Sequence, residues 1–359
     1  MKGFDVAGSH RITDEATLRA FPKVELHRHL EGTFELNTLH QMAMKNGLDL
    51  PEEMAEFKKA VQFPKDSEPD FLKFLSKFRV DWYRTLDDIF DIAYASVLDM
   101  ANDGIFYIEL RFSPEHFALQ NDFDRKIVTK LIVRAANEAA REAGIYLRFL
   151  ITFNRMKQTP REMIDLYEEV KSLKQDEIVG VDLAGDETNY PPEDFVEFFD
   201  HIKKDGVYRS TIHAGEVTPS HQIWTSINQL HASRIGHGTS AIDDPELQKV
   251  LVDRGIVLEQ CITSNYQTGS WADEKNHPLG RLYRNSVPVT INSDDPTIQD
   301  TDLTEDYVKA VQYFDLTAAD LEAMNMIALD GAFISEAERV DIKNRYRRRL
   351  SKIAGIAAT

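Results

Sequence analysis

Eight short runs of apolar, β-favouring residues recur along the 359-residue chain, separated by longer amphipathic stretches. The runs lie at 23–27, 104–113, 145–153, 178–184, 208–213, 233–237, 256–262 and 287–292. Several are apolar nearly throughout, as in IFYIELRF and YLRFLITF, which is typical of parallel strands covered by helices. Apolar spacing of three and four predicts intervening helices at 86–102, 125–143, 161–174 and 192–205. This alternation predicts an α/β fold of the TIM (β/α)8 barrel class.

The connection between the first two strands is longer than a barrel repeat requires. It spans about 75 residues, whereas one repeat needs about 30 to 40. We therefore expect a helical insertion over about 35–100. Its centre, PDFLKFLSKF, places Phe71 and Phe74 at helical spacing, so it is either a helix packed on the barrel or a hydrophobic lid. Residues 303–356 predict a C-terminal helical extension, and we expect 1–359 to form one barrel domain.

Charge and cysteine content exclude several classes of protein. The chain carries 60 acidic and 42 basic residues, a net charge of −18, which is unsuited to a nucleic-acid backbone. The single cysteine, Cys261, rules out an internal disulfide framework and a cysteine-rich zinc site. No signal peptide is visible, and no apolar stretch approaches the roughly 18 residues of a spanning helix. We expect a cytoplasmic protein that binds neither nucleic acid nor membranes, and the sequence indicates no oligomeric state.

Polar residues end or follow most of the predicted strands. In chain order they are His27, His29, His213, Glu216, His237, Asp294 and Asp295, and Gly185 follows the fourth run in DLAGDE. In a barrel the carboxyl ends of all the strands meet on one face, where active sites form. Residues far apart in sequence are therefore expected to share one pocket.

The residue types predict a catalytic metal site. His27 and His29 are two apart on an extended segment, so both imidazoles project to the same side. With His213 and Asp294 they supply nitrogen and oxygen donors suited to Zn²⁺, and water would complete a catalytic site. We expect one Zn²⁺ per chain. The remaining histidines are expected to be ordinary core or surface residues: His10, His40, His116, His201, His221, His231 and His277.

The other strand-end residues have roles that a metal hydrolase needs. His237 is a candidate base or electrostatic partner beside the activated water, and Glu216 is the candidate general acid. Alternatively, Glu216 and Asp295 cap the helices that follow them. Gly185 is either a plain turn or a position where a substrate approaches the backbone.

Five motifs in order, ELHRHLEG, GVDLAGDE, TIHAGEV, RIGHG and NSDDP, resemble the adenosine deaminase family of the amidohydrolase superfamily. The resemblance runs from about residue 20 to about residue 340 and includes YIELRFSPEHF and QCITSNYQTGSW. It implies a Zn²⁺ site with His237 beside the metal-bound water. The implied zinc ligands are His27, His29, His213 and Asp294.

The same resemblance implies how a purine would be held. Glu216 would protonate N1, Asp295 would hydrogen-bond the N7 side, and the Gly185 N–H would meet N3. His29 and Glu31 would also contact the substrate, with Phe71 and Phe74 on the lid. The implied reaction is zinc-dependent deamination of adenosine, with 2′-deoxyadenosine, to inosine and ammonia in purine salvage.

One position departs from the family pattern. Adenosine-specific members usually carry Asp where this chain has Glu31, at the contact to the ribose 5′-hydroxyl. The longer side chain either still meets a hydroxyl or favours another adenine-containing compound: adenine, 5′-methylthioadenosine or 6-aminodeoxyfutalosine. The segment CITSNYQTG is closer to the nucleoside branch. A different metal hydrolase on the same barrel, or a non-enzymatic binding protein, are the remaining alternatives.

Overall fold

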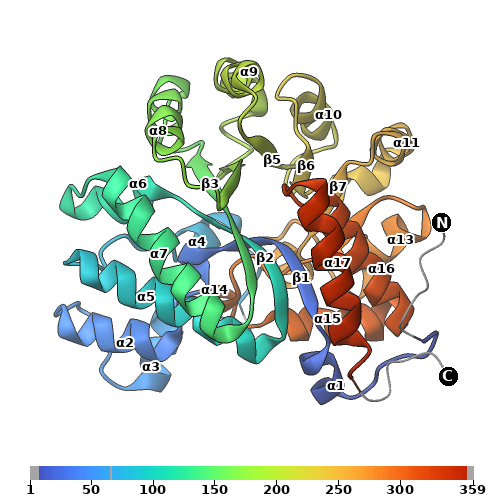
Figure 1. The fold of residues 1–359 in the computed structure, drawn as a ribbon, viewed down its shortest axis with the longest axis horizontal. Coiled ribbons are helices and arrows are strands. Elements are labelled where there is room, and N and C mark those ends of the chain that lie inside the picture. The colour runs from blue at the N-terminus through green and yellow to red at the C-terminus, as the bar shows by residue number, and fades with distance from the viewer. Residues whose placement is uncertain (1–7, 65–66, 354–359) are drawn as a thin grey trace.

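Eight parallel strands form a single sheet, in the order in which they follow one another along the chain. The computed structural model describes residues 8–64 and 67–353 (Figure 1). The strands are β1 Lys23–His29, β2 Ile105–Phe112, β3 Tyr146–Asn154, β4 Ile178–Ala184, β5 Arg209–Ala214, β6 Arg234–His237, β7 Val257–Gln260 and β8 Val289–Ile291. Each lies within two residues of a predicted run. The predicted (β/α)8 barrel is confirmed.

The first and last strands are joined by hydrogen bonds just beyond the end of β8. The Asp294 amide donates to the His27 carbonyl at 3.0 Å, and the His29 amide donates to the Asp294 carbonyl at 2.9 Å. Further down the seam, the Leu26 amide donates to Oδ1 of Asn292 at 3.0 Å. These bonds close the barrel at the same residues that the sequence assigns to the metal site.

Helices surround the strands in Figure 1. Those after β2 to β8 are α6 Pro114–Ala118, α7 Arg125–Ala143, α8 Pro160–Ser172, α9 Val196–Asp205, α10 His221–Asn228, α11 Pro245–Arg254, α12 Ile262–Gln267, α13 Leu279–Arg284 and α14 Pro296–Gln299. Local signals explain their ends. Asp124 caps α7 by accepting from two amides, and Gly144, with φ of 71°, ends it. Thr159 and Glu162 form a capping box on α8.

The insertion between β1 and β2 forms four helices in the part of it that the structure describes. They are α2 Leu36–Lys45, α3 Met54–Val61, α4 Phe71–Leu75 and α5 Leu86–Asp99. The lid segment was expected to be helical from Phe71 to Phe78, but α4 ends at Leu75. The chain turns there, and the Phe78 ring packs back against Phe74 with ring centres 6.0 Å apart. The helix ends in a turn: the Ser76 hydroxyl donates to the Lys73 carbonyl at 2.6 Å, and the Lys77 amide donates to the Phe74 carbonyl three residues back at 3.0 Å.

The predicted C-terminal extension is present as α15 Leu303–Phe314, α16 Ala318–Gly331 and α17 Glu336–Leu350. Residues 354–356 of the prediction lie outside the described residues. A short helix that was not predicted, α1 Glu15–Ala20, precedes β1. No described helix has both the length and the apolar character needed to cross a bilayer.

Asp103 anchors the extension to the barrel and is 6% exposed. Its carboxylate accepts from the amides of Leu303 and Thr304, at 2.8 and 2.9 Å, and contacts Arg28 at 3.2 Å. It therefore satisfies two amides at the start of α15 and pairs with a buried guanidinium.

Replacing Asp103 with Ala should lower the free energy of unfolding by about 2–4 kcal/mol, because buried donors lose their acceptor. Denaturant unfolding followed by circular dichroism measures this. Asp103→Asn retains a carbonyl acceptor and should lose less. Asp124→Ala, at the cap of α7, should cost only about 1 kcal/mol. An Asp103→Ala protein as stable as the Asp124→Ala protein would contradict the anchoring role.

Candidate active site

The candidate site residues gather at the carboxyl ends of the strands. His27 and His29 belong to β1, His213 to β5 and His237 to β6, while Asp294 follows β8. His237 and Asp294 both adopt left-handed backbone, with φ of 58° and 66°. Few non-glycine residues do so, and such positions concentrate at functional sites where the surroundings hold them in place.

Four of these residues bring their donor atoms within 4.8 Å of one another: His27, His213, His237 and Asp294. Nε2 of His29 completes the group, 3.3 Å from Nε2 of His213 and 3.5 Å from Oδ1 of Asp294. Nε2 of His27 and Oδ1 of Asp294 are buried 3.2 Å apart, and neither has a hydrogen-bond partner. Two buried atoms that face each other without a hydrogen-bond partner fit two ligands of one shared cation. The combination of imidazole nitrogens and a carboxylate oxygen fits Zn²⁺.

Burial determines the charge of three of the imidazoles, whereas in His27 the contacts with Asp294 and Glu259 outweigh burial and raise the pKa. Burial lowers the pKa of His29, His213 and His237 below the ordinary value. These rings are therefore neutral at neutral pH, which is the form that can donate a lone pair to a metal.

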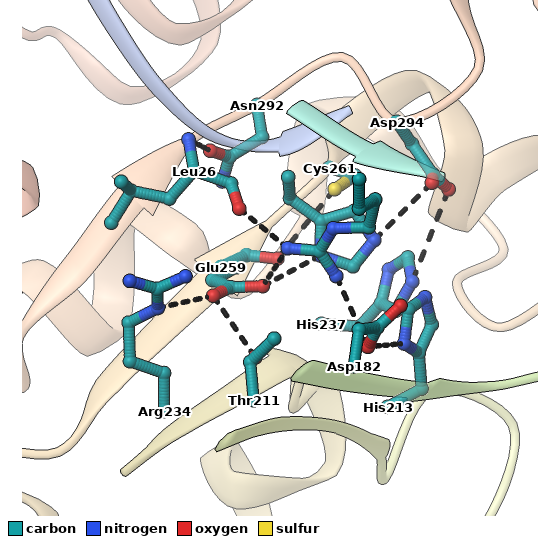
Figure 2. Close-up of polar contacts among 12 residues, drawn as sticks. Leu26, Asp182, Thr211, His213, Arg234, His237, Glu259, Cys261, Asn292 and Asp294 are labelled. Carbon is teal, nitrogen blue, oxygen red and sulfur yellow. Dashed lines mark hydrogen bonds and ion pairs between the residues drawn. The ribbon is translucent and has the colours of Figure 1, made fainter. Parts of the chain in front are cut away.

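A layer of two buried carboxylates, Glu259 and Asp182, contacts the histidines (Figure 2). Oε2 of Glu259 is 2.8 Å from Nδ1 of His27, and Oδ1 of Asp182 is 2.9 Å from Nδ1 of His213. Arg111 contacts both carboxylates, at 2.8 Å to Glu259 and 3.3 Å to Asp182. Carboxylates at Nδ1 orient the rings and leave Nε2 free for a metal.

Sequence reasoning missed this carboxylate layer. Asp182 and Glu259 lie in the middle of β4 and β7, and both are fully buried. A charged residue inside an otherwise apolar strand was the available signal, because such a charge must have a partner inside the barrel.

The site opens into one pocket that contains the substrate-binding residues expected from the sequence. Among its lining residues are His29, Glu31, Phe71, Phe74, Gly185, His213, Glu216, His237, Asp294 and Asp295. His27 does not line it, since its side chain is fully buried behind the others. Most of the exposed lining is apolar and a smaller part is polar, as in many small-molecule sites.

Glu216 and Asp295 face the pocket. Oε2 of Glu216 lies 3.7 Å from Nε2 of His237. Burial, with Glu187 nearby, raises the pKa of Glu216, and burial beside Asp294 raises the pKa of Asp295. Both carboxyl groups can therefore carry a proton at neutral pH and donate it or share it in a hydrogen bond.

The alternative role of these two acids as helix caps can be compared with the helix ends. Asp295 occupies the cap position of α14, but its side chain makes no capping hydrogen bond. Glu216 lies before the turn that leads to α10, whose cap position is Ser220. Neither carboxyl group is used as a cap.

Two glycines make room at the site. A Cβ on Gly32 would lie 1.8 Å from Oδ1 of Asp295, so only glycine lets that carboxyl group point inward. Gly185 follows β4 with φ of 104°, a conformation that favours glycine. Its position on the pocket wall leaves the backbone open to close approach by a ligand.

Glu31 lines the same pocket, and only one of its two carboxylate oxygens has a hydrogen-bond partner. Its Oε1 accepts from the Ser113 amide at 2.6 Å, whereas its Oε2 is buried without a partner. Burial raises the pKa of Glu31 to about 7. His116, expected to be an ordinary histidine, also lines the pocket, and its Nε2 is likewise unpartnered.

Comparison with known proteins agrees with this geometry. The profile of the family described as "Adenosine deaminase" matches residues 22–348. The chain is 34% identical to an adenosine deaminase of Serratia proteamaculans over 332 residues, which cover 91% of this chain and 98% of that protein. A Proteus mirabilis adenosine deaminase is 35% identical over 323 residues, covering 89% and 95%.

A solved structure of similar fold contains zinc. It is an amidohydrolase from Burkholderia ambifaria with bound Zn, 26% identical, with a TM-score of 0.85 and 98% of each chain covered. These matches set aside a non-enzymatic binding protein and an unrelated hydrolase. The chain belongs to the adenosine deaminase family and is a hydrolytic deaminase with an amidohydrolase-type barrel.

Proposed function

We propose that this protein is a zinc-dependent deaminase of adenosine and 2′-deoxyadenosine, producing inosine or 2′-deoxyinosine and ammonia in purine salvage. The observation that carries the proposal is the convergence of three neutral histidines, an ionised Asp294 and two protonatable acids in one pocket, with His27 buried directly behind them. Similarity to proteins named adenosine deaminase over nearly their whole length supports the same substrate.

One Zn²⁺ per chain would be held by His27, His29, His213 and Asp294. When bound, it supplies Lewis acidity that makes a water molecule nucleophilic at neutral pH. Among these ligand atoms, Nε2 of His27 and Oδ1 of Asp294 are buried and have no hydrogen-bond partner in the protein.

The chain's own residues would orient the purine and manage its protons. Glu216 would donate a proton to ring N1, which prevents negative charge from building up on the ring as water adds to C6. Asp295, in its protonated form, would donate a hydrogen bond to N7, and the Gly185 N–H would bind N3. The C6–O bond forms and the C6–N bond breaks, so that adenosine and water become inosine and ammonia.

The insertion would cover the substrate. Phe71, Phe74 and Phe78 line the pocket with Leu75, and Leu72 is 61% exposed next to them. These apolar side chains would exclude water from the purine as α4 closes over it.

A second candidate substrate class rests on Glu31. Its free Oε2 can accept a hydrogen bond from a ribose hydroxyl, which keeps adenosine first. The alternative is deamination of adenine, 5′-methylthioadenosine or 6-aminodeoxyfutalosine, in which the longer Glu31 side chain would face something other than a ribose 5′-hydroxyl.

We also propose a single domain and a cytoplasmic location. One buried core cluster contains residues from Ile12 to Leu350 and thereby unites the barrel, most of the insertion and the extension. A lone buried cysteine is consistent with a reducing compartment.

The substrate assignment is tested by following the loss of the ultraviolet absorbance of the adenine ring with five compounds. These are adenosine, 2′-deoxyadenosine, 5′-methylthioadenosine, adenine and 6-aminodeoxyfutalosine. We expect the highest kcat/KM with the first two, because Glu31 presents a free acceptor to the ribose. Turnover of one of the others without adenosine would contradict the proposed substrate but not the deaminase chemistry.

Glu216→Gln should keep its zinc and lower kcat at least about a hundredfold, the usual scale for a lost general acid. Steady-state kinetics and elemental analysis of the same sample measure both. Asp88→Asn changes a buried carboxylate on α5 that pairs with Lys45, away from the pocket, and should leave kcat near the wild-type value. Near-normal turnover by Glu216→Gln would refute its role.

His27→Ala should lose zinc together with activity, because it removes one donor and uncovers another, Asp294. Zinc per chain, measured by elemental analysis after dialysis, is the readout. His201→Ala, which removes a histidine paired with Glu168 outside the site, is the control and should retain its zinc. Equal zinc in the two variants would rule out His27 as a ligand.

A further inference from the structure

A chain of four hydrogen-bonding groups leads from a backbone amide to His237. The Leu279 amide lies 3.3 Å from Nδ1 of His277, and Nε2 of His277 lies 3.0 Å from Oδ1 of Asn265. Nδ2 of Asn265 lies 3.1 Å from Nδ1 of His237. The side chains of His277, Asn265 and His237 are at most 1% exposed. Burial on this scale makes each donor and acceptor assignment consequential.

The direction of donation along this row of hydrogen bonds is determined by its first member, the Leu279 amide. A backbone N–H can only donate, so Nδ1 of His277 must accept. Burial lowers the pKa of His277 to about 3, so the ring is neutral and its one proton is on Nε2. Nε2 therefore donates to Asn265, and the carbonyl oxygen of the Asn265 amide must face it.

The orientation of the Asn265 amide in turn determines which ring nitrogen of His237 accepts a hydrogen bond. With its oxygen facing His277, the Asn265 amide presents its NH₂ group to Nδ1 of His237. A proton on that nitrogen would place two donors against each other, so Nδ1 accepts. The proton of neutral His237 is then on Nε2, which faces Glu216 at 3.7 Å and Asp294 at 3.9 Å.

This tautomer is opposite to that of two neighbouring histidines. Nδ1 of His27 faces Glu259 and Nδ1 of His213 faces Asp182, and a carboxylate can only accept. Those rings therefore carry a proton on Nδ1, which leaves Nε2 as the nitrogen that can offer a lone pair to a metal. In His237 the corresponding nitrogen carries hydrogen and cannot coordinate a metal.

We propose that Asn265 and His277 are positioning residues that hold His237 as a hydrogen-bond donor toward the reacting oxygen, and not as a ligand or a proton acceptor. The catalytic part of this statement rests on the proposed function. The tautomers themselves depend only on the hydrogen-bond chain.

The helix that carries Asn265 is well placed for this task. In α12, the Ser264 hydroxyl donates to Oδ2 of Asp294 at 2.7 Å, so adjacent residues set His237 and the carboxylate beside it. The Trp271 amide donates to the Asn265 carbonyl at 2.8 Å and fixes the backbone from which the amide side chain extends.

Nitrogen NMR of zinc-loaded protein labelled with ¹⁵N-histidine reads the tautomers directly. The expected wild-type spectrum shows His237 protonated on Nε2, and His27 and His213 protonated on Nδ1. Asn265→Asp replaces the donating NH₂ group with an acceptor of the same size. It should move the His237 proton to Nδ1 and lower kcat at least about tenfold, with KM changed less than about threefold.

A second pair of variants separates positioning from packing. His277→Leu removes the donor that orients Asn265 and should lower kcat and broaden or shift the His237 resonances. His277→Gln supplies an amide donor and should return the tautomer and most of the turnover. Asn325→Asp, a buried change on α16, should alter thermal stability without moving the His237 resonances.

Two results would overturn the proposal. One is a wild-type spectrum with the His237 proton on Nδ1, and the other is an Asn265→Asp protein whose His237 resonances and kcat are unchanged. The spectrum needs no substrate. If adenosine is not deaminated but the spectra are as expected, the proposed substrate fails while the tautomer assignment holds.

Discussion

The barrel interior is organised by buried carboxylates that must be paired. Glu259, fully buried on β7, contacts Arg111, Arg234 and His27 at 2.8 Å or less. Moving an unpaired carboxylate into such an interior costs several kcal/mol, and the arginines offset this cost only in a fixed geometry. A group that is held on three sides cannot turn, so the imidazole that it contacts is also held.

This constraint connects the strands to the chemistry. Arg234 also pairs with Glu109 on β2 at 2.6 Å, and Arg111 reaches Asp182 on β4. The ion pairs therefore span the barrel from one wall to the other beneath the histidines. Because each of these ion pairs joins two different strands, the donor geometry at the pocket floor depends on the register of the sheet.

The sequence predicted the strands and the strand-end residues well, because parallel buried strands are apolar along their whole length and end in polar turns. Within the insertion it predicted the helices observed as α4 and α5 but not α2 and α3. It did not predict that α4 stops at Leu75, since short helices are stabilised mainly by tertiary packing, which apolar spacing does not reveal. His277 could not be told from an ordinary core histidine. Its importance comes from contacts with Asn265 and Leu279 that only the folded chain brings together.

The seam of the barrel has a consequence for how the protein is made. His27 and Asp294, 267 positions apart, are neighbours only because β1 meets the end of β8. During synthesis, β1 can pair with β2 but lacks its other neighbour, β8, until nearly the whole chain has left the ribosome. A nascent chain that lacks the last strand has the three histidines of the donor set but not the Asp294 carboxylate that completes it. Metal acquisition would then be a late event that reports completed barrel closure.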